Sequence, residues 1–382
     1  MKIILFGGAF NPVHNEHIAM LKAAVSRLGA DKAIIMPTAV APHKTGYITA
    51  PPAARLEMCH IAFDGIAEVS DFEINKGGAS YSYITCDYLR HKYPDDEIYF
   101  LMGADMFDCF ADWVYPERIL KDVKLVVCSR TGSADVNQSQ KHFEEQFGTS
   151  AEIVDFTGAP VSSTRTRVAA ALGANISDYV PHEISKYIKK NGIYKIPDLA
   201  KAQKLLTSKR AEHTLRVAFM AAENCRRFKI TEKKAVTAAA LHDAAKYLKL
   251  SDKRLKGFVP PEGVPDKVMH QYAGAYLAEH EFGITDEDIL NAIRYHTSGR
   301  AGMSDLEKLI FLSDMLEEGR KFEGVDKLRK LFAEDMDKCL ECALHDELGF
   351  LKESGGDIYP LTQEAYDYIK KQNAEKQVQK TE

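Results

Sequence analysis

Gly8-Ala9-Phe10-Asn11-Pro12-Val13-His14-Asn15-Glu16-His17 follows the apolar run Ile3-Ile4-Leu5-Phe6 near the start of this 382-residue chain. A buried strand that ends in glycines and opens a helix leaves backbone N–H groups free at the helix start, where they and the helix dipole hold a phosphate. His14 and His17 are three residues apart, so both face the same side of the first helical turn. The spacing is neither that of a Walker loop nor that of a GxGxxG dinucleotide loop. It predicts a nucleoside triphosphate site without a P-loop lysine.

Short apolar runs alternate with helical patterns from the first residue to about residue 192. This alternation predicts an α/β domain with a Rossmann-like, doubly wound parallel sheet that is covered by helices on both faces. In such a sheet we expect functional residues at the carboxyl ends of the strands. The predicted strands are 2–6, 33–36, 69–74, 98–102, 123–128 and 153–156.

Beyond Asn191-Gly192, which ends a helical pattern, the sequence shows helix starts but no convincing strand pattern. Thr285 with Asp288 is one such helix start, because the two residues have the spacing of a capping signal. The length of the chain favours two domains. We therefore expect an α/β domain over residues 1–194, an all-α helical bundle over 195–372 and a polar tail over 373–382.

Composition and charge are those of an ordinary globular protein, with 45% hydrophobic and 27% charged residues. The formal net charge of -5 and the dispersed lysines and arginines argue against a nucleic-acid partner. No apolar stretch approaches the roughly 18 residues that a membrane span needs, and Met1-Lys2 leads straight into an apolar run without a signal segment. We therefore expect a cytoplasmic protein without a membrane partner, whose seven dispersed cysteines are reduced thiols.

The segment GGAFNPVH resembles the GGxFxPxHxGH motif of the nucleotidylyltransferase superfamily, and in particular that of bacterial nicotinate mononucleotide adenylyltransferases. The resemblance implies adenylyl transfer from ATP to nicotinate mononucleotide, with Mg²⁺ as the cofactor and with deamido-NAD and pyrophosphate as the products. It places Gly8 and Phe10 against the nucleotide and gives His14 and His17 catalytic roles. Glu16 stands where the family has glycine, a difference that could crowd the adenosine end of ATP.

Other predicted strand ends carry residues that match the family's substrate contacts. Gly103 allows a close backbone approach, and Asp105 can accept ribose hydroxyls. Trp113, the single tryptophan, suits either core packing or stacking on an aromatic ring. Thr85 matches the family's pyridine-contacting threonine, and Arg130 ends a predicted strand. We expect all five residues at the substrate-binding site.

Two further segments complete this candidate site. Pro42-His43-Lys44 resembles the family's PPHK loop, whose lysine helps to hold substrate phosphate. Val161-Ser162-Ser163-Thr164-Arg165-Thr166-Arg167 places hydroxyls and an arginine at a predicted helix start, which favours phosphate binding, and it resembles the family's ISSTxxR motif. We expect Ser162 and Ser163 to bind substrate, and Lys44 and Arg167 to act in catalysis. Because phosphoryl-type transfer needs mainly positioning and charge neutralisation, no nucleophilic side chain is required.

Six histidine and aspartate residues of the helical half, each within a helical pattern, are candidate metal ligands. The adjacent pair His242-Asp243 in an alanine-rich, core-like helix is costly unless both residues are paired or bind a metal. Imidazole and carboxylate ligands on separate helices suit iron or manganese, with zinc as an alternative. We therefore expect a metal site formed by His213, His242, Asp243, His270, His296 and Asp314.

The order H…HD…H…H…D resembles that of the HD-domain phosphohydrolases, and the segments around these residues resemble the YqeK-type subgroup. The resemblance implies a di-iron or other divalent metal pair and symmetrical hydrolysis of diadenosine tetraphosphate to ADP. Asp243 would then bridge the two ions and act in catalysis. Lys246 and Arg300 would hold the remaining polyphosphate charge, unless they are solvated helix ends.

The two resemblances together predict a bifunctional enzyme of NAD biosynthesis, an adenylyltransferase fused to a metal-dependent phosphohydrolase. One alternative is an adenylyltransferase whose helical domain only senses nucleotides, and another is a transferase for a different acceptor. The expected partners are ATP, nicotinate mononucleotide and dinucleoside polyphosphates. The sequence leaves open the choice between nicotinate and nicotinamide mononucleotide, the identity of the metal, and whether the chain forms a homo-oligomer.

Overall fold

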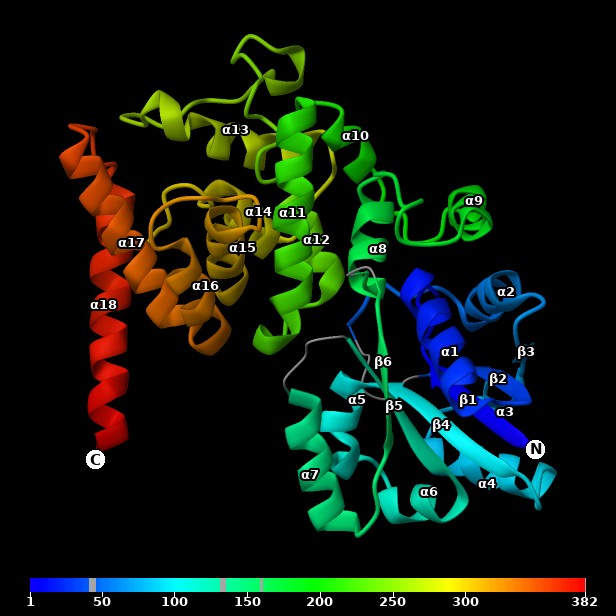
Figure 1. Ribbon diagram of the computed structural model, residues 1–382. Helices are drawn as coiled ribbons and strands as arrows, with labels where there is room; N and C mark the ends of the chain where they lie inside the picture. Colours follow the sequence, from blue (N-terminus) through cyan, green and yellow to red (C-terminus); the bar gives the residue numbers. More distant parts are fainter. Residues whose placement is uncertain (41–45, 131–134, 159–160, 382) are drawn as a thin grey trace. The chain divides into compact units, whose positions relative to one another are not determined.

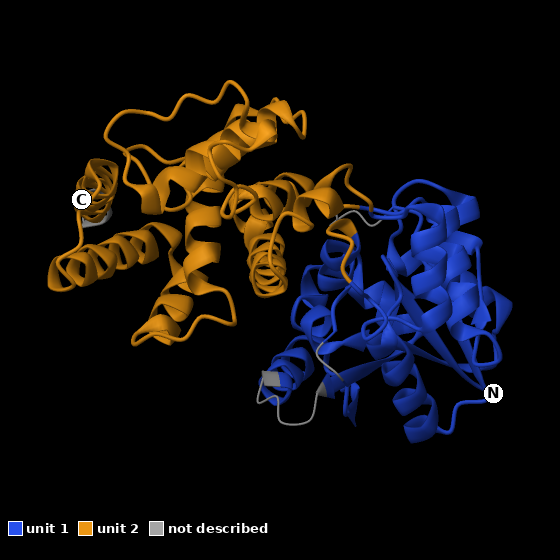
Figure 2. Cartoon of the chain, turned by 90° about the horizontal axis from the view of Figure 1, so that it is seen from above, with its two compact units in different colours: residues 1–45, 49–170, 175–194 blue, residues 46–48, 171–174, 195–382 orange. Residues whose placement is uncertain are grey.

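The computed structural model describes residues 1–40, 46–130, 135–158 and 161–381, which form two compact units. No helix of these described residues is long and apolar enough to cross a membrane. The first unit comprises Met1–Thr45, Thr49–Ala170 and Asn175–Tyr194, and the second comprises Gly46–Ile48, Ala171–Ala174 and Lys195–Glu382 (Figure 2).

Parallel strands form the sheet of the first unit, in the order β3-β2-β1-β4-β5-β6 (Figure 1). Strand order reverses at β1, which has β2 on one side and β4 on the other, so a crevice for a ligand is expected at the carboxyl end of β1. This confirms the predicted doubly wound sheet. The strands are β1 Lys2–Gly8, β2 Lys32–Pro37, β3 Glu68–Val69, β4 Glu97–Gly103, β5 Lys124–Arg130 and β6 Glu152–Phe156.

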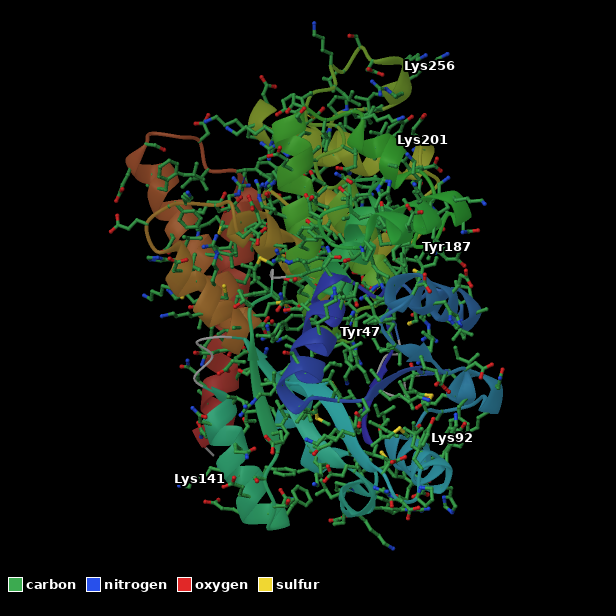
Figure 3. The ribbon with its side chains drawn as sticks, turned by 45° about the vertical axis from the view of Figure 1, so that its right-hand side comes forward. Tyr47, Lys92, Lys141, Tyr187, Lys201 and Lys256 are labelled. Carbon is green, nitrogen blue, oxygen red and sulfur yellow. The ribbon has the colours of Figure 1, made fainter. Side chains whose placement is uncertain are left out.

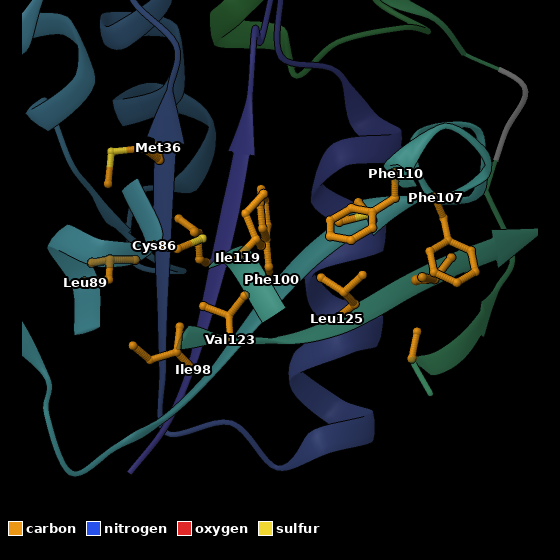
Figure 4. Close-up of a cluster of buried hydrophobic side chains, with 14 of the residues drawn as sticks. Met36, Cys86, Leu89, Ile98, Phe100, Phe107, Phe110, Ile119, Val123 and Leu125 are labelled. Atoms are coloured by element: carbon orange, nitrogen blue, oxygen red, sulfur yellow. The ribbon is translucent and has the colours of Figure 1, made fainter. Parts of the chain in front are cut away.

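Helices cover the sheet of the first unit and bury its apolar side chains. Ile3 and Leu5 of β1 belong to a core cluster that also contains Leu89, Phe107 and Ile119 from three helices (Figure 4). Ile4 is also fully buried but points to the other face, because successive strand residues alternate. The elements are α1 Asn15–Leu28, α2 Pro52–Phe63, α3 Phe72–Lys76, α4 Ser82–Lys92, α5 Ala104–Asp108, η1 Phe110–Asp112, α6 Pro116–Asp122, α7 Asp135–Phe147, α8 Ser163–Ala171 and α9 His182–Asn191.

The strand predicted over residues 69–74 is wrong for most of its length. Strand β3 ends at Val69, and helix α3 begins at Phe72. The Phe72 ring stacks on the Tyr88 ring of α4, with 3.8 Å between the ring centroids, so this apolar residue is packed from a helix. A short apolar run fits either a strand or a buried helix, and the sequence pattern does not separate the two.

The described part of the second unit is helical, as the sequence predicts. Helix α12 packs against α10, α11, α14 and α15 (Figure 1). Residues 235–241 of α12 are all buried, four of them alanine. The elements are α10 Leu199–Gln203, α11 Ser208–Asn224, η2 Cys225–Phe228, α12 Glu232–Leu241, η3 Lys253–Leu255, α13 Asp266–His280, α14 Glu287–Arg294, α15 Asp305–Leu316, α16 Val325–Glu334, α17 Met336–Glu353 and α18 Pro360–Thr381.

The short segment Gly46–Ile48 belongs to this second unit, although it comes from the first part of the sequence. Glu232, the first residue of α12, is fully buried, and its backbone N–H donates to the Gly46 carbonyl at 2.8 Å. Its carboxylate accepts a hydrogen bond of 2.6 Å from the backbone N–H of Ile48. Tyr47, labelled in Figure 3, has its ring 4.8 Å from the guanidinium of Arg226. These contacts attach the segment to the start of α12.

Residues 373–381, expected as a polar tail, are the last turns of helix α18. Asn373 is only 6% exposed. Its side-chain amide donates to the Asp337 carbonyl at 3.1 Å and to a Glu341 carboxylate oxygen at 2.7 Å, both on α17. This segment is therefore helical and packs against α17, although its polar composition alone suggests a solvent-exposed tail.

Candidate active sites

His14 and His17 lie together at the start of α1, above the carboxyl end of β1. Their rings are stacked, with 3.6 Å between centroids, and His14 is only 6% exposed. Phe10 adopts a left-handed backbone conformation (φ 44°) and packs its ring edge-on against His17 at 5.1 Å. The backbone N–H of His14 donates to Nδ1 of His17 at 3.1 Å. Because this Nδ1 is an acceptor, a neutral His17 carries its proton on Nε2 and presents an Nε2–H donor.

Hydrogen bonds connect the start of α8 to the loop that precedes His14. The Ser163 hydroxyl donates to the Pro12 carbonyl at 2.9 Å. Arg167 is 3% exposed, and its guanidinium donates to the Asn11 carbonyl at 2.8 Å and to the Thr164 hydroxyl at 3.0 Å. Ser162 accepts from the backbone N–H of Arg165 at 3.2 Å. In this structure Arg167 therefore holds the loop that carries the histidines.

The carboxyl end of β4 carries the next group of expected residues. A Cβ on Gly103 would lie 2.6 Å from a carboxylate oxygen of Asp105, so any larger residue there would require the Asp105 side chain to move. Trp113 is half-buried and packs on Phe100 and Phe110, with ring centroids 5.9 and 5.3 Å away. One side of the indole thus packs against the hydrophobic core. Lys44 lies outside the described residues, and the side chain of Arg130 is not among those described.

Thr85 has a buried acidic partner that sequence reasoning missed. Its hydroxyl, on a side chain 2% exposed, donates to Glu73 Oε1 at 2.5 Å. Burial raises the pKa of Glu73, although its hydrogen bonds to Ser80 and Thr85 oppose the shift. Ser80 in turn accepts from the backbone N–H of Ala39 at 3.0 Å, beyond the end of β2. Glu73 was not predicted because a single glutamate in a short helix has no distinguishing spacing.

Arg55 is the second residue that the sequence did not indicate. It is 3% exposed, and its guanidinium donates to the carbonyls of Ala9, Thr38 and Ala39 at 2.7, 2.7 and 2.8 Å. A buried guanidinium with carbonyl partners fixes the loops that follow β1 and β2. Nothing in the surrounding alanines and prolines marks this arginine as different from a solvated one.

In the second unit, all six predicted ligand residues converge from five segments. Nε2 of His213 on α11 lies 2.8 Å from Oδ1 of Asp314 on α15, and Nε2 of His242 lies 3.4 Å from Oδ2 of Asp243, directly after α12. The Asp243 Oδ1 atom lies 3.6 Å from Nε2 of His296. Two sets have ligand atoms within 4.8 Å of one another and so could each hold a metal ion: His213 with His242 and Asp314, and His242 with Asp243 and His296.

His270 on α13 joins the cluster beside these sets. Its Nε2 lies 3.3 Å from Asp243 Oδ1 and 3.2 Å from Nε2 of His296. Burial and the neighbouring His296 and Lys246 lower the pKa of His270 to about 3. It is therefore neutral near pH 7, the form in which imidazole binds a metal.

Buried atoms without hydrogen bonds show that this cluster fits a metal. Among the described residues, Nε2 of His213, Nε2 of His242 and Oδ1 of Asp243 are buried and have no hydrogen-bond partner. A buried polar atom without such a partner is costly. Burial alone would raise the pKa of Asp243, but His242 and His296 lower it, so the carboxylate is ionised. Bare imidazole nitrogens beside carboxylates are a donor set suited to a divalent transition metal.

Three of the histidines are oriented in the same way by acceptors behind them. Nδ1 of His242 lies 2.6 Å from the Ala239 carbonyl, and Nδ1 of His296 lies 2.8 Å from the Ile293 carbonyl. Nδ1 of His213 lies 3.0 Å from a carboxylate oxygen of Glu317. Because these oxygens only accept, each Nδ1 carries the proton and each Nε2 lone pair points into the cluster.

Cations surround the cluster, but not all of those that were expected. Lys246 Nζ lies 3.8 Å from Asp243 Oδ1 and 3.0 Å from Nε2 of His270. Arg210, which the sequence did not indicate, lies 2.9 Å from Asp243 Oδ2. Arg300 is instead paired with the buried Glu307 through contacts of 2.6 and 2.9 Å. The structure thus brings Lys246 to the cluster and shows Arg300 engaged with a carboxylate.

Comparisons with known proteins agree with this division. The chain matches the cytidylyltransferase-like family over residues 5–169 and the HD domain family over residues 210–344. The symmetrical bis(5'-nucleosyl)-tetraphosphatase of Bacillus subtilis is 38% identical over 178 residues, which are 45% of this chain and 95% of that protein. The probable nicotinate-nucleotide adenylyltransferase of Clostridium tetani is 35% identical over 198 residues, which are 51% of this chain and 99% of that protein.

A further relative spans both units. The probable nicotinate-nucleotide adenylyltransferase/Ap4A hydrolase of Mycoplasma genitalium is 31% identical over 344 residues, which are 86% of this chain and 93% of that protein. The match confirms both resemblances drawn from the sequence motifs and shows that they occur together in one chain. This chain therefore belongs to the family of two-domain proteins named nicotinate-nucleotide adenylyltransferase/Ap4A hydrolase.

Proposed function

We propose that this protein is a bifunctional enzyme. Its first unit transfers the adenylyl group of ATP to nicotinate mononucleotide, and its second unit hydrolyses diadenosine tetraphosphate symmetrically to ADP. The observation that carries the second activity is the convergence of His213, His242, Asp243, His296 and Asp314, with bare Nε2 atoms directed at carboxylates. The first rests on the paired histidines at a helix start and on the relatives that match each half.

Adenylyl transfer needs positioning of two phosphates in the first unit. A phosphate oxygen of the mononucleotide attacks the α-phosphorus of ATP, the bond to the β-phosphate bridging oxygen breaks, and pyrophosphate leaves with the electron pair. The Nε2–H of His17 and the N-terminus of α1 stabilise the charge that develops on the triphosphate. Mg²⁺ bound with ATP would neutralise the leaving pyrophosphate. Lys44, Arg130, Ser162 and Thr85 are proposed substrate contacts.

Hydrolysis in the second unit needs a metal pair, which we propose to be iron or manganese. Bound by these residues, the pair would supply hydroxide and neutralise phosphate charge. Asp243 is the proposed bridging ligand, because its two carboxylate oxygens face His242 on one side and His270 and His296 on the other. Lys246 and Arg210 hold the phosphates that are not attacked. Water attacks one central phosphorus, the bond to the central bridging oxygen breaks, and two ADP leave.

A pair of variants tests both activities in the full chain. His17→Ala should lower adenylyl transfer on the order of a hundredfold, because one preorganised donor is lost, and should leave hydrolysis unchanged. Asp243→Ala should abolish hydrolysis and lower the bound metal per chain, measured by elemental analysis, while transfer stays normal. His345→Ala is the matched control, since the His345 side chain is 69% exposed.

The substrates tested are ATP with nicotinate or nicotinamide mononucleotide, and dinucleoside polyphosphates after anaerobic iron or manganese loading. Wild-type protein that binds metal but cleaves none of these polyphosphates would leave the second unit as a nucleotide sensor. Normal transfer by His17→Ala would overturn the proposed role of the histidine pair. The free thiols of all seven cysteines are consistent with the cytoplasmic location that we propose.

A further inference from the structure

Tyr247 is a large aromatic residue held in place beside the metal cluster but open to solvent. It follows Lys246 in the turns after α12, and it is 52% exposed. Its hydroxyl interacts with the side chain of Thr207, the residue that caps α11, and with the guanidinium of Arg210. An exposed tyrosine that served only solubility would not need two partners on another helix.

Arg210 connects this ring to the cluster. One of its guanidinium nitrogens lies 2.9 Å from Asp243 Oδ2, and the same guanidinium interacts with the Tyr247 hydroxyl. A single side chain thus separates the tyrosine hydroxyl from a carboxylate that faces three histidines. Lys246, the preceding residue, approaches the other oxygen of that carboxylate at 3.8 Å. From the cluster outward, the Asp243 carboxylate comes first, the cations Arg210 and Lys246 come next, and the Tyr247 ring follows.

That order matches the chemistry of a nucleotide. Phosphates require cations next to the metal, and the base, farther along the molecule, requires an apolar face. Tyrosine supplies such a face at a low entropic cost, because it has only two side-chain torsions. Leu250, three residues further on, is 53% exposed and adds apolar surface to this part of the chain.

We propose that the Tyr247 ring is the stacking platform for one adenine of the dinucleoside polyphosphate, with Arg210 fixing the ring relative to the metal cluster. The proposal rests on the function proposed for the second unit and adds its base-binding residue. Stacking uses the π face that every base has, so this platform binds the adenine without reading a particular hydrogen-bonding edge.

The test uses the full chain loaded with Mn²⁺ and four variants. Tyr247→Leu keeps apolar bulk but removes the π face, whereas Tyr247→Phe keeps the ring and removes the hydroxyl. Tyr368→Leu is the control, because Tyr368 is 41% exposed and its hydroxyl bonds Gln372 on its own helix. Titration calorimetry measures the binding of ADP and of inorganic pyrophosphate. Only the binding that Asp243→Ala removes is counted, so that the nucleotide site of the first unit does not contribute.

We expect Tyr247→Leu to weaken ADP binding on the order of tenfold, the loss of one base stack, and to leave pyrophosphate binding unchanged. Tyr247→Phe should weaken ADP binding less than Tyr247→Leu does, because it keeps the π face and loses only the contact with Arg210, and it should leave pyrophosphate binding unchanged. With diadenosine tetraphosphate, Tyr247→Leu should raise KM and leave kcat nearly unchanged, because the ring contacts the substrate away from the reacting phosphorus. The Tyr368→Leu variant should behave as wild type.

Equal ADP binding by Tyr247→Leu and the wild type would overturn the platform. The platform would also be overturned if Tyr247→Leu weakened the binding of ADP and of pyrophosphate equally. It would be overturned as well if Tyr247→Phe bound ADP as weakly as Tyr247→Leu, since either result would trace the effect to the hydroxyl and Arg210. The hydrolase proposal fails separately: a wild-type chain that binds ADP through Tyr247 but cleaves no polyphosphate retains the platform and loses the catalytic assignment.

Discussion

Replacing Glu317 by glutamine should weaken both the metal centre and the fold of the second unit. Glu317 is 2% exposed, and its carboxylate accepts from Nδ1 of His213 at 3.0 Å, from Arg216 at 2.6 Å and from the backbone N–H of Gly319 at 2.5 Å. Burial alone would raise the pKa of Glu317, but the bonds from His213 and Arg216 lower it from 4.5 to about 2. Folding therefore favours the ionised carboxylate.

The size of the effect follows from this shift. Moving a pKa from 4.5 to about 2 is worth roughly 3 kcal/mol at neutral pH. Water reaches Arg216, which is 28% exposed, so we expect about half of that value in the free energy of unfolding. Because the pKa is lowered in the folded state, the contribution is complete above pH 4.5 and is lost as the pH falls through about 2. The loss in Glu317→Gln should therefore be constant between about pH 6 and 8.

Two measurements check this prediction. Urea unfolding of the metal-free protein at neutral pH gives the change in stability, and Mn²⁺ titration gives the change in affinity, which we expect to fall by roughly 10- to 100-fold because His213 loses its orienting carboxylate. Glu318→Gln is the matched control, since Glu318 is the adjacent glutamate and is exposed. A Glu317→Gln variant that equals this control in both measurements would refute the reasoning.

Three further predictions concern other parts of the chain. Thr85→Val leaves the buried Glu73 without that partner and should lower the free energy of unfolding by about 1 to 3 kcal/mol; unchanged urea unfolding would contradict it. Because the folded-state pKa of His270 is lowered to about 3, the metal-free protein should lose stability as the pH falls below about 6.5. A His270→Gln variant should lose less of its free energy of unfolding between pH 7 and 5 than the wild type does. If urea unfolding gave both proteins the same dependence of stability on pH, His270 would not be the cause. Fragments 1–194 and 195–382 should each give the circular dichroism of a folded unit, the second with a lower melting temperature because Glu232 loses its bond from Ile48; an unfolded second fragment would contradict the division.

The sequence predicts those parts of the fold and the sites that have a repeating or spaced pattern. The apolar run before Gly8 identifies β1, and two histidines three apart identify one face of α1. The pair His242-Asp243 stands out because ionisable residues are rare within an alanine-rich helix. These patterns involve residues that are close in sequence, so they can be recognised without knowledge of the fold.

The residues that the sequence did not predict are defined by their partners in space. Glu317 and Arg210 look like ordinary surface residues until α15 and α11 bring them to His213 and Asp243. Glu73 and Arg55 become functional candidates only through burial, which depends on packing between distant segments. The same holds for Asn373, whose polar surroundings in the sequence give no sign of its contacts with α17. Tertiary contacts, rather than propensity, decide these positions.

Helix α12 has a consequence for how the sequence of this family member can change. Its buried alanines at 235, 238, 239 and 240 set how closely α11, α14 and α15 approach its axis. Each methylene added there would push a neighbouring helix outward, and a shift of a few tenths of an ångström on α11 or α15 would move His213 or Asp314. The distances between metal ligands are thus encoded partly in side chains that contact no metal. We therefore expect that only small side chains are tolerated at these positions of α12, although the side chains themselves take no part in the reaction.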